Sequence, residues 1–450
     1  MEKTREGEIK TTAVGWIEAN RAALNQVSRQ IWEFAELAFH EFKSSDLLVR
    51  QLEAAGFTVE RGQARMPTAF VGTFRRGSGR PVVGFIAEYD AMPGTHPDNT
   101  DQPGHSCGHN LFGTASVAAG IACKEAMVRH QVDGTVKVFG TPAEESAGGK
   151  VWMIREKVFD GCDAIITWHP QPFNQVAYDG NLAIVKLEVD FYGRSAHPGT
   201  EPEKGRSALD GLQLFTMACE FLREHMIDEM KLHYIITHGG KAPNAIPDYA
   251  QCQMMLRGPT MADIETVLDR DGGLKDCARG AALATGTRVE IRCTGGFYEE
   301  VPSKSGAYMF YENMKAIGAP QYTEEELAFA RARGYEAIDN KVYEPASIKI
   351  KASHDTGDVS WAVPTLCGLC TTCMAKGTPG HSVDRAAFSG MSIGEKGMIY
   401  AAKIMSATAL DLLLRSTKLD EVISEWKERI KNKAPYQMIL PVDSWPLIPE

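Results

Sequence analysis

The chain has 450 residues, 44% of them hydrophobic and 24% charged, which is an ordinary balance for a globular enzyme. Its formal net charge of −10 argues against a nucleic-acid-binding protein, because such proteins normally carry a basic patch. The length exceeds what one hydrophobic core usually holds, so we expect two domains.

The N-terminus and the cysteine content indicate a cytoplasmic protein. The first residues, Met1 to Glu8, are charged and no long apolar run follows them, so we expect neither a signal peptide nor a membrane anchor. Ten cysteines in a chain of this length are not a disulfide framework, and in a reducing compartment we expect them to be thiols or metal ligands.

The first 182 residues predict alternating helices and strands. Apolar residues recur at three- and four-residue steps between residues 16 and 55, which is typical of helix. Residues 81–87, 134–140 and 162–168 are typical of buried strands, and residues 111–130 of an apolar helix that packs on them. This alternation favours a mostly parallel sheet with helices on both faces.

Three soft or borderline metal ligands lie within seven residues, at His105, Cys107 and His109. Cys107 and His109 can reach one transition-metal ion when the backbone bends, and Gly108 between them permits the bend. Taken alone, the pair fits a packed cysteine beside solvated histidines equally well.

Other candidate ligands directly follow strand-like segments, where α/β sheets build their sites. Adjacent carboxylates at a strand end, such as Glu144 and Glu145, point to opposite sides, so one can bind a metal ion while the other moves protons. His169 follows another apolar run in the same way. Asp90 follows a third apolar run, and it is a candidate for a carboxylate that does not bind the metal itself but orients a residue that does.

The sequence changes character after Leu182. Residues 183–298 predict the order strand, helix, strand, strand, helix, strand, which is the ferredoxin-like unit. This segment is long enough to fold as a domain of its own. We therefore expect an α/β catalytic domain formed by residues 1–182 and 299–450, with an α+β domain inserted at residues 183–298.

The last part of the chain predicts a polar turn at residues 353–358, a strand at residues 361–372 and a long apolar helix at residues 390–414. A Gly/Pro loop carries His381, and composition alone indicates a surface histidine there. The strand also has CxxCxxC spacing but no fourth nearby ligand at zinc-site spacing, so we interpret its cysteines as structural thiols and not as a metal cluster. These cysteines are Cys367, Cys370 and Cys373.

An ordered series of motifs resembles the M20 metallopeptidases and amidohydrolases, and within them the branch of aminobenzoyl-glutamate hydrolases and aminoacyl amidases. The motifs span the chain from the first buried strand to the loop before the last long helix. They are Glu88–Pro93, Gly104–Asn110, Gly140–Glu145, Trp168–Pro170, Gly193–His197, Ala242–Pro247, Gly357–Trp361 and Gly377–His381.

The resemblance implies a two-metal hydrolase whose inserted domain acts as a lid and mediates dimerisation. Carried over by motif, Glu144 would be the general base, and a thiolate would lower the net charge of the metal cluster. Such a ligand set suits zinc, manganese or cobalt ions. The implied metal ligands are Cys107, His109, Glu145, His169 and His381.

Residues of the lid are expected to contact substrate. His197 would stabilise the oxyanion, and in the resembling family the matching histidine enters the site of the partner subunit. Asn244 and Arg257 look suited to a substrate carboxylate, since a guanidinium offers a bidentate fork, although Arg257 fits a solvated charge equally well. His354 and Asp355, like His105, either line the site or are solvated loop residues, and we favour the second interpretation.

The expected reaction is hydrolysis of an amide bond in a small N-aminobenzoyl, N-aminoacyl or dipeptide-like amino acid. One alternative is a hydrolytic deaminase that uses the same site on an aromatic amine and releases ammonia. The other is a non-catalytic metal-binding protein, against which the intact Glu144 argues. We expect a homodimer through the lid, a small-molecule substrate, and neither nucleic acid nor membrane as a partner.

Overall fold

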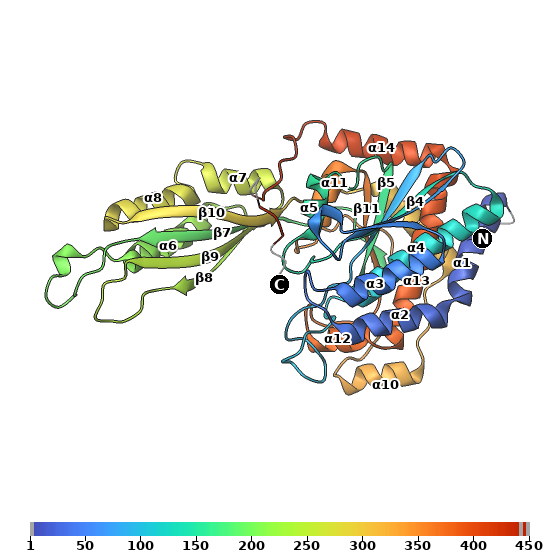
Figure 1. The fold of residues 1–450 in the computed structure, drawn as a ribbon, viewed down its shortest axis with the longest axis horizontal. Coiled ribbons are helices and arrows are strands. Elements are labelled where there is room, and N and C mark those ends of the chain that lie inside the picture. The colour runs from blue at the N-terminus through green and yellow to red at the C-terminus, as the bar shows by residue number, and fades with distance from the viewer. Residues whose placement is uncertain (1–3, 441–443, 447–450) are drawn as a thin grey trace.

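The structure is a computed structural model that describes residues 4–440 and 444–446. It has two lobes (Figure 1): a larger catalytic domain, and a smaller domain formed by residues 183–297, which we call the lid. The chain enters and leaves the lid through neighbouring strands, because Ile184 pairs with Phe297. Each lobe has its own hydrophobic core.

A seven-stranded sheet forms the centre of the catalytic domain, with the order β1-β2-β4-β3-β5-β11-β6. The four inner strands β4, β3, β5 and β11 pair in parallel, whereas the pairs towards both edges are antiparallel. All six residues of β3 are buried, as expected for a strand covered on both faces. The strands are β1 (Thr58–Arg61), β2 (Phe70–Arg76), β3 (Val82–Ala87), β4 (Gly134–Gly140), β5 (Ala164–Gln171), β6 (Gln175–Val176) and β11 (Thr365–Thr372).

Helices cover this sheet, and the two longest, α4 and α13, pack against each other and against its strands. Both are long and apolar enough to cross a membrane by length and composition alone. In the fold, 83% and 89% of their apolar windows are buried, as in core helices. The helices are α1 (Arg5–Ala19), α2 (Arg21–Phe34), α3 (Phe42–Ala54), α4 (His109–His130), α5 (Gly149–Arg155), α9 (Lys304–Ile317), α10 (Glu324–Ala332), α11 (Thr356–Ala362), α12 (Val383–Ser389), α13 (Ser392–Leu414) and α14 (Ser416–Ile430).

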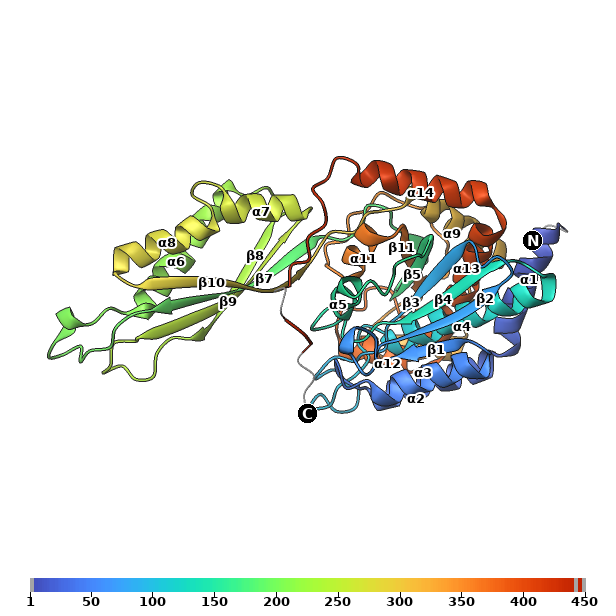
Figure 2. The ribbon, with the colours of Figure 1, turned by 45° about the horizontal axis from the view of Figure 1, so that its top comes forward.

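The lid is a four-stranded antiparallel sheet with helices on one face (Figure 2). Its strand order, β10-β7-β9-β8, is that of the ferredoxin-like unit and leaves β8 at an edge. The elements are β7 (Ala183–Tyr192), α6 (Ala208–Leu222), β8 (Lys231–His238), β9 (Tyr249–Gly258), α7 (Met261–Asp269), α8 (Leu274–Thr285) and β10 (Arg288–Phe297).

The expected fold class is confirmed, with parallel pairing confined to the four inner strands. The second helix expected in the lid is split into α7 and α8, and two element boundaries in the last part of the chain were wrong. The expected strand at residues 361–372 begins only at Thr365, and Trp361 belongs to α11, which also takes up half of the expected polar turn. The expected helix over residues 390–414 begins at Ser392, and a separate short helix, α12, precedes it.

The C-terminal tail after α14 crosses the junction between the two lobes (Figure 1). Lys433 forms an ion pair with Glu299 at 2.8 Å, and the Tyr436 hydroxyl donates to Asp358 at 2.9 Å. Further along, Trp445 stacks beneath the guanidinium of Arg155, 3.8 Å from the ring centroid. The tail therefore contacts both the catalytic domain and the junction with the lid.

Candidate metal centre

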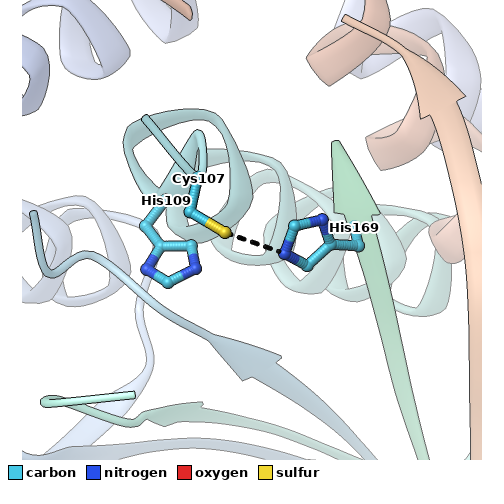
Figure 3. A group of neighbouring side chains, drawn as sticks. All are labelled: Cys107, His109 and His169. Atoms are coloured by element: carbon cyan, nitrogen blue, oxygen red, sulfur yellow. Dashed lines mark hydrogen bonds between the residues drawn. The ribbon is translucent and has the colours of Figure 1, made fainter. Parts of the chain in front are cut away.

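Ligand-type side chains meet where the inner strands end. The Cys107 sulfur lies 3.3 Å from His169 Nε2, and His109 stands beside them at the start of α4 (Figure 3). One ligand atom from each of these residues lies within 4.8 Å of the others. Gly108 makes the turn with a φ of +79°, and a Cβ there would approach Pro170 to 3.0 Å. Glycine is therefore required between the two ligands.

Hydrogen bonds fix which ring nitrogen of each histidine is free. His109 Nδ1 lies 2.8 Å from Asp90 Oδ1, and His169 Nδ1 lies 3.0 Å from the Pro170 carbonyl oxygen. Because both acceptors need a proton on Nδ1, each Nε2 keeps a lone pair for a metal ion. Burial, with Arg385 nearby, also lowers the pKa of His169 well below its usual value, so this ring is neutral as a ligand must be.

A second group of ligand atoms shares Cys107 with the first. It contains Glu145 and His381, whose Nε2 lies 3.7 Å from Glu145 Oε2. The His381 side chain is 53% exposed, so this histidine stands at the mouth of the site. The backbone N–H of Glu145 donates to Asp90 Oδ2 at 2.9 Å, so Asp90 holds one ligand from each group. The structure thus brings all five expected ligands together.

Glu144 turns away from Glu145. Its Oε2 lies 3.8 Å from His109 Nε2 and its Oε1 lies 3.5 Å from His354 Nε2. The preceding Ala143 has a left-handed φ of +61°, which is uncommon for alanine, and its N–H donates to buried Glu41 at 2.9 Å. The Ala143 turn therefore places the Glu144 carboxylate next to His109, and not among the ligand atoms of the second group.

The centre is crowded with buried carboxyl groups. Burial is the main cause that raises the pKa of Glu144 to about 8 and that of Glu145 to about 7, and neighbouring carboxylates add to it. Burial and Glu145 also raise the pKa of the Cys107 thiol to about 12. Bound cations would relieve this repulsion and ionise the thiol.

The residues present fit a transition-metal site. Buried His109 Nε2 and Glu145 Oε1 have no hydrogen-bond partner among the described residues, although buried polar atoms are normally paired. Both atoms point into groups of cysteine, histidine and carboxylate, the donor set that zinc and related ions prefer. No group of this kind among the described residues includes Cys367, Cys370 or Cys373, and these buried free thiols fit the structural interpretation.

A cavity of about 580 Å³ opens over the centre and lies between the two lobes. Its walls include Glu144 and His169 and, from the lid, Lys186 and Arg257. Neither lid cation forms an ion pair with a described carboxylate; Lys186 donates to the Ser146 carbonyl oxygen and Arg257 to the Ser353 hydroxyl. This wall can therefore accept an anionic group.

The structure does not bring His197 and Asn244 to this cavity. Both are exposed in loops at the far end of the lid, and a backbone bond from Ile246 to Ala196 joins those loops. Strand β7 alone separates them from the junction by its ten residues, or about 30 Å. Within one chain, the expected contacts of His197 and Asn244 with substrate are therefore not formed.

Around Glu144, sequence reasoning missed Lys150 and Glu88, and it preferred a solvated position for His354 and Asp355. Lys150 is fully buried and contacts Glu88 Oε1 at 2.7 Å and Asp355 Oδ1 at 2.6 Å. His354 is 14% exposed and lines the cavity, so the preference for a solvated His354 and Asp355 was wrong. His105 is also buried, but it contacts the Ile31 carbonyl oxygen and does not line the cavity. Burial disfavours a charged His354, but Glu88 and Glu144 outweigh it and raise its pKa to about 10.

The position of Glu88 in the sequence could have identified it as a site residue. It follows β3 two residues before Asp90, and side chains two apart after a strand share a side. Glu88 Oε2 indeed lies 3.3 Å from His109 Nε2.

Cysteine, histidine and carboxylate ligands lie together at the ends of the parallel strands, and Glu144 stands beside them outside the expected ligand set. This combination of fold and site is that of a metal-dependent hydrolase. Residues 84–411 match the model of peptidase family M20/M25/M40, and the chain belongs to this family. The expected family and the expectation of a hydrolytic enzyme are both confirmed.

Relatives cover nearly the whole chain. It is 36% identical to a p-aminobenzoyl-glutamate hydrolase subunit of Escherichia coli (strain K12), over 96% of this chain and 97% of that protein. It is 29% identical to Xaa-Arg dipeptidase of Mus musculus, over 94% of each chain. A Bacillus subtilis protein described as a dinuclear metal-binding peptidase of the M20 family has the same fold, with a TM-score of 0.63 at 17% identity, over 88% of this chain and 99% of that one.

Proposed function

We propose that the protein hydrolyses the amide bond of a small N-acyl amino acid or dipeptide that carries a free carboxylate. The observation that carries this proposal is Glu144, which lies 3.8 Å from the ligand His109 in a cavity whose opposite wall presents Arg257 without a carboxylate partner among the described residues. The amide-cleaving relatives support it, since their names describe an aminobenzoyl-glutamate hydrolase and a dipeptidase.

Different side chains bind the metal ions, transfer the proton and bind the substrate. Cys107, His109, Glu145, His169 and His381 would hold divalent ions, which supply an acidified water and polarise the amide carbonyl. Glu144 accepts a proton from the attacking water on its carboxylate oxygen and passes that proton to the nitrogen of the leaving amine. Burial raises the pKa of Glu144, and bound cations would lower it again, so that the carboxylate form is available to accept this proton. Arg257 binds the substrate carboxylate and holds the amide over Glu144.

A substrate panel tests this function. Metal-loaded protein is assayed with N-aminobenzoyl, N-aminoacyl and N-acyl amino acids and with the matching amides, in which the free carboxylate is blocked. We expect release of the amino acid from the acids and little turnover of the blocked compounds. Release of ammonia from an aromatic amine would instead identify a deaminase, and no turnover of any compound would refute the proposal.

We further propose two ions of zinc, manganese or cobalt per subunit, because the two ligand groups share Cys107 and contain too many ligands for one tetrahedral catalytic ion. Elemental analysis after reconstitution should give about two ions per chain, and full activity in chelator would refute this. A cytoplasmic location is also part of the proposal, supported by ten free cysteines.

We propose that the lid pairs with the lid of a second copy. Helix α6 exposes Met217 and Phe221, at 56% and 68%, and the edge strand β8 exposes Ile235 at 63%. An open edge strand beside exposed apolar side chains is a surface that natural proteins usually cover. Pairing would let His197, which cannot reach its own cavity, serve the oxyanion of the partner's site. Because the name of the Escherichia coli relative describes one subunit of a hydrolase, a distinct chain is the alternative partner.

Complementation tests the pairing. Glu144→Ala and His197→Ala proteins, each inactive alone, are mixed and re-assembled. Random pairing gives half heterodimers, each with one complete site of two, so about one quarter of wild-type activity should return. A mixture of Glu144→Ala with His109→Ala is the matched control and should recover nothing, since both residues serve the same site. No recovery by the first mixture, with subunit exchange confirmed, would exclude a shared site.

A further inference from the structure

A fully buried lysine lies behind the metal centre. The amine of Lys150 lies between Glu88 and Asp355, and the backbone N–H of Lys150 also donates to Asp355 Oδ2 at 3.1 Å. Burying a charge costs several kcal/mol per ion unless it is paired, and none of these groups belongs to the expected ligand set. The ion pairs join the start of α5 to the end of β3 and to the residue before α11.

His354 precedes Asp355 in this clamped segment, and its ring orientation is fixed. Its Nδ1 lies 2.6 Å from the Thr356 hydroxyl and 3.1 Å from the Thr356 backbone nitrogen. Nε2 carries a proton, because the carboxylates of Glu88 and Glu144 in front of it favour the charged ring. It is buried and has no hydrogen-bond partner of normal geometry among the described residues. Nε2 lies 3.3 Å from Glu88 Oε1 and 3.5 Å from Glu144 Oε1.

The two oxygens of Glu144 therefore have different neighbours. Oε1 faces the N–H of His354, and Oε2 faces the ligand His109. We propose that His354 is a positioning residue: its Nε2–H holds Glu144 Oε1, so that Oε2 is the oxygen presented to the reacting water. The Lys150, Glu88 and Asp355 ion pairs hold His354 in turn. The inference rests on the proposed role of Glu144 as general base.

Variants at His354 test this role. His354→Ala should lower kcat about 10- to 100-fold, because a displaced base loses its alignment with the reacting atoms. KM should change less than twofold and the metal content should stay the same. His354→Gln should return kcat to within about fivefold of wild type, since the glutamine amide can place an N–H near the position of Nε2. His130→Ala is the matched control: this half-buried histidine has one side-chain hydrogen bond, to Thr12, and lies at the other end of α4.

Crystal structures of the wild type and both variants give a readout that needs no substrate. The Glu144 carboxylate should keep its orientation in His354→Gln and rotate in His354→Ala. An effect on KM alone, a loss of metal, or no rescue by glutamine would overturn the inference, as would an unmoved Glu144. If the wild type cleaves nothing on the substrate panel, the proposed function fails, while the crystal structures still decide the role of His354.

Discussion

Replacing Asp90 with asparagine should weaken metal binding about 10- to 100-fold. Both oxygens of Asp90 accept an N–H group, one from His109 at 2.8 Å and one from the Glu145 backbone at 2.9 Å. The asparagine side chain has the same shape but offers one oxygen and one NH₂. In either orientation the asparagine NH₂ faces the N–H of His109 or of Glu145. One of these two ligands therefore loses its hydrogen bond.

The magnitude follows from the bond that is lost. A hydrogen bond to a charged group contributes about 1.5–3 kcal/mol, and each 1.4 kcal/mol is about tenfold in affinity. Loss of one carboxylate partner behind a histidine ligand has a similar effect in other metal sites, about 10- to 100-fold. Competition against a chelator of known affinity measures this change directly. The protein should stay folded, because a hydrogen bond is lost but no cavity forms.

Glu41→Gln is the matched control. Glu41 is another buried carboxyl group, and it accepts the Ala143 N–H at 2.9 Å and the Thr68 hydroxyl at 3.0 Å. A glutamine can keep the first bond, and its NH₂ can donate to the hydroxyl oxygen, which also accepts. Burial and Asp90 raise the pKa of Glu41 to about 8, so a neutral replacement is close to the native state at pH 7. Equal metal affinity of Asp90→Asn and wild type, or equal weakening by both variants, would refute the reasoning.

Two further changes separate catalysis from metal binding. Glu144→Gln should lower turnover at least about 100-fold with metal content unchanged, because the amide keeps the shape and loses the basicity; retained activity would move the base elsewhere. Cys107→Ser should lower both metal occupancy and rate, since a hydroxyl is a far weaker ligand than a thiolate, and full occupancy measured by elemental analysis would remove Cys107 from the ligand set.

Four of the five expected ligands carry local signals in the sequence, whereas His381 was assigned only through the family resemblance. Cys107 and His109 flank one glycine, and Glu145 and His169 stand at or just beyond strand ends, so short windows contain both the residue type and its place in the sheet. Lys150 gives no such signal. Its partner Asp355 is 205 residues away, and their meeting depends on how α5 packs against α11.

The lid shows a second limit. Strand β9 and its preceding loop carry both Arg257 and Asn244, but only one end of the strand faces the metals. Arg257 lies beside Ile184 at the junction, whereas Asn244 lies in the loop at the opposite end. Strand pairing decides this, and the alternating pattern of a strand contains no information about which end is near the site. Trp361 was assigned to a strand for a related reason, because aromatic residues favour strands until packing overrides them.

The tail that crosses between the lobes has a practical consequence for handling the protein. Residues 444–446 lie against the catalytic domain, where Trp445 stacks on Arg65 and Arg155. An affinity tag fused close behind this segment would crowd the surface on which Trp445 stacks. The first helix, α1, lies at the end of the catalytic domain remote from the lid (Figure 2). A purification tag or a surface-immobilisation linker therefore belongs at the N-terminus, away from the lid and from the Trp445 contacts.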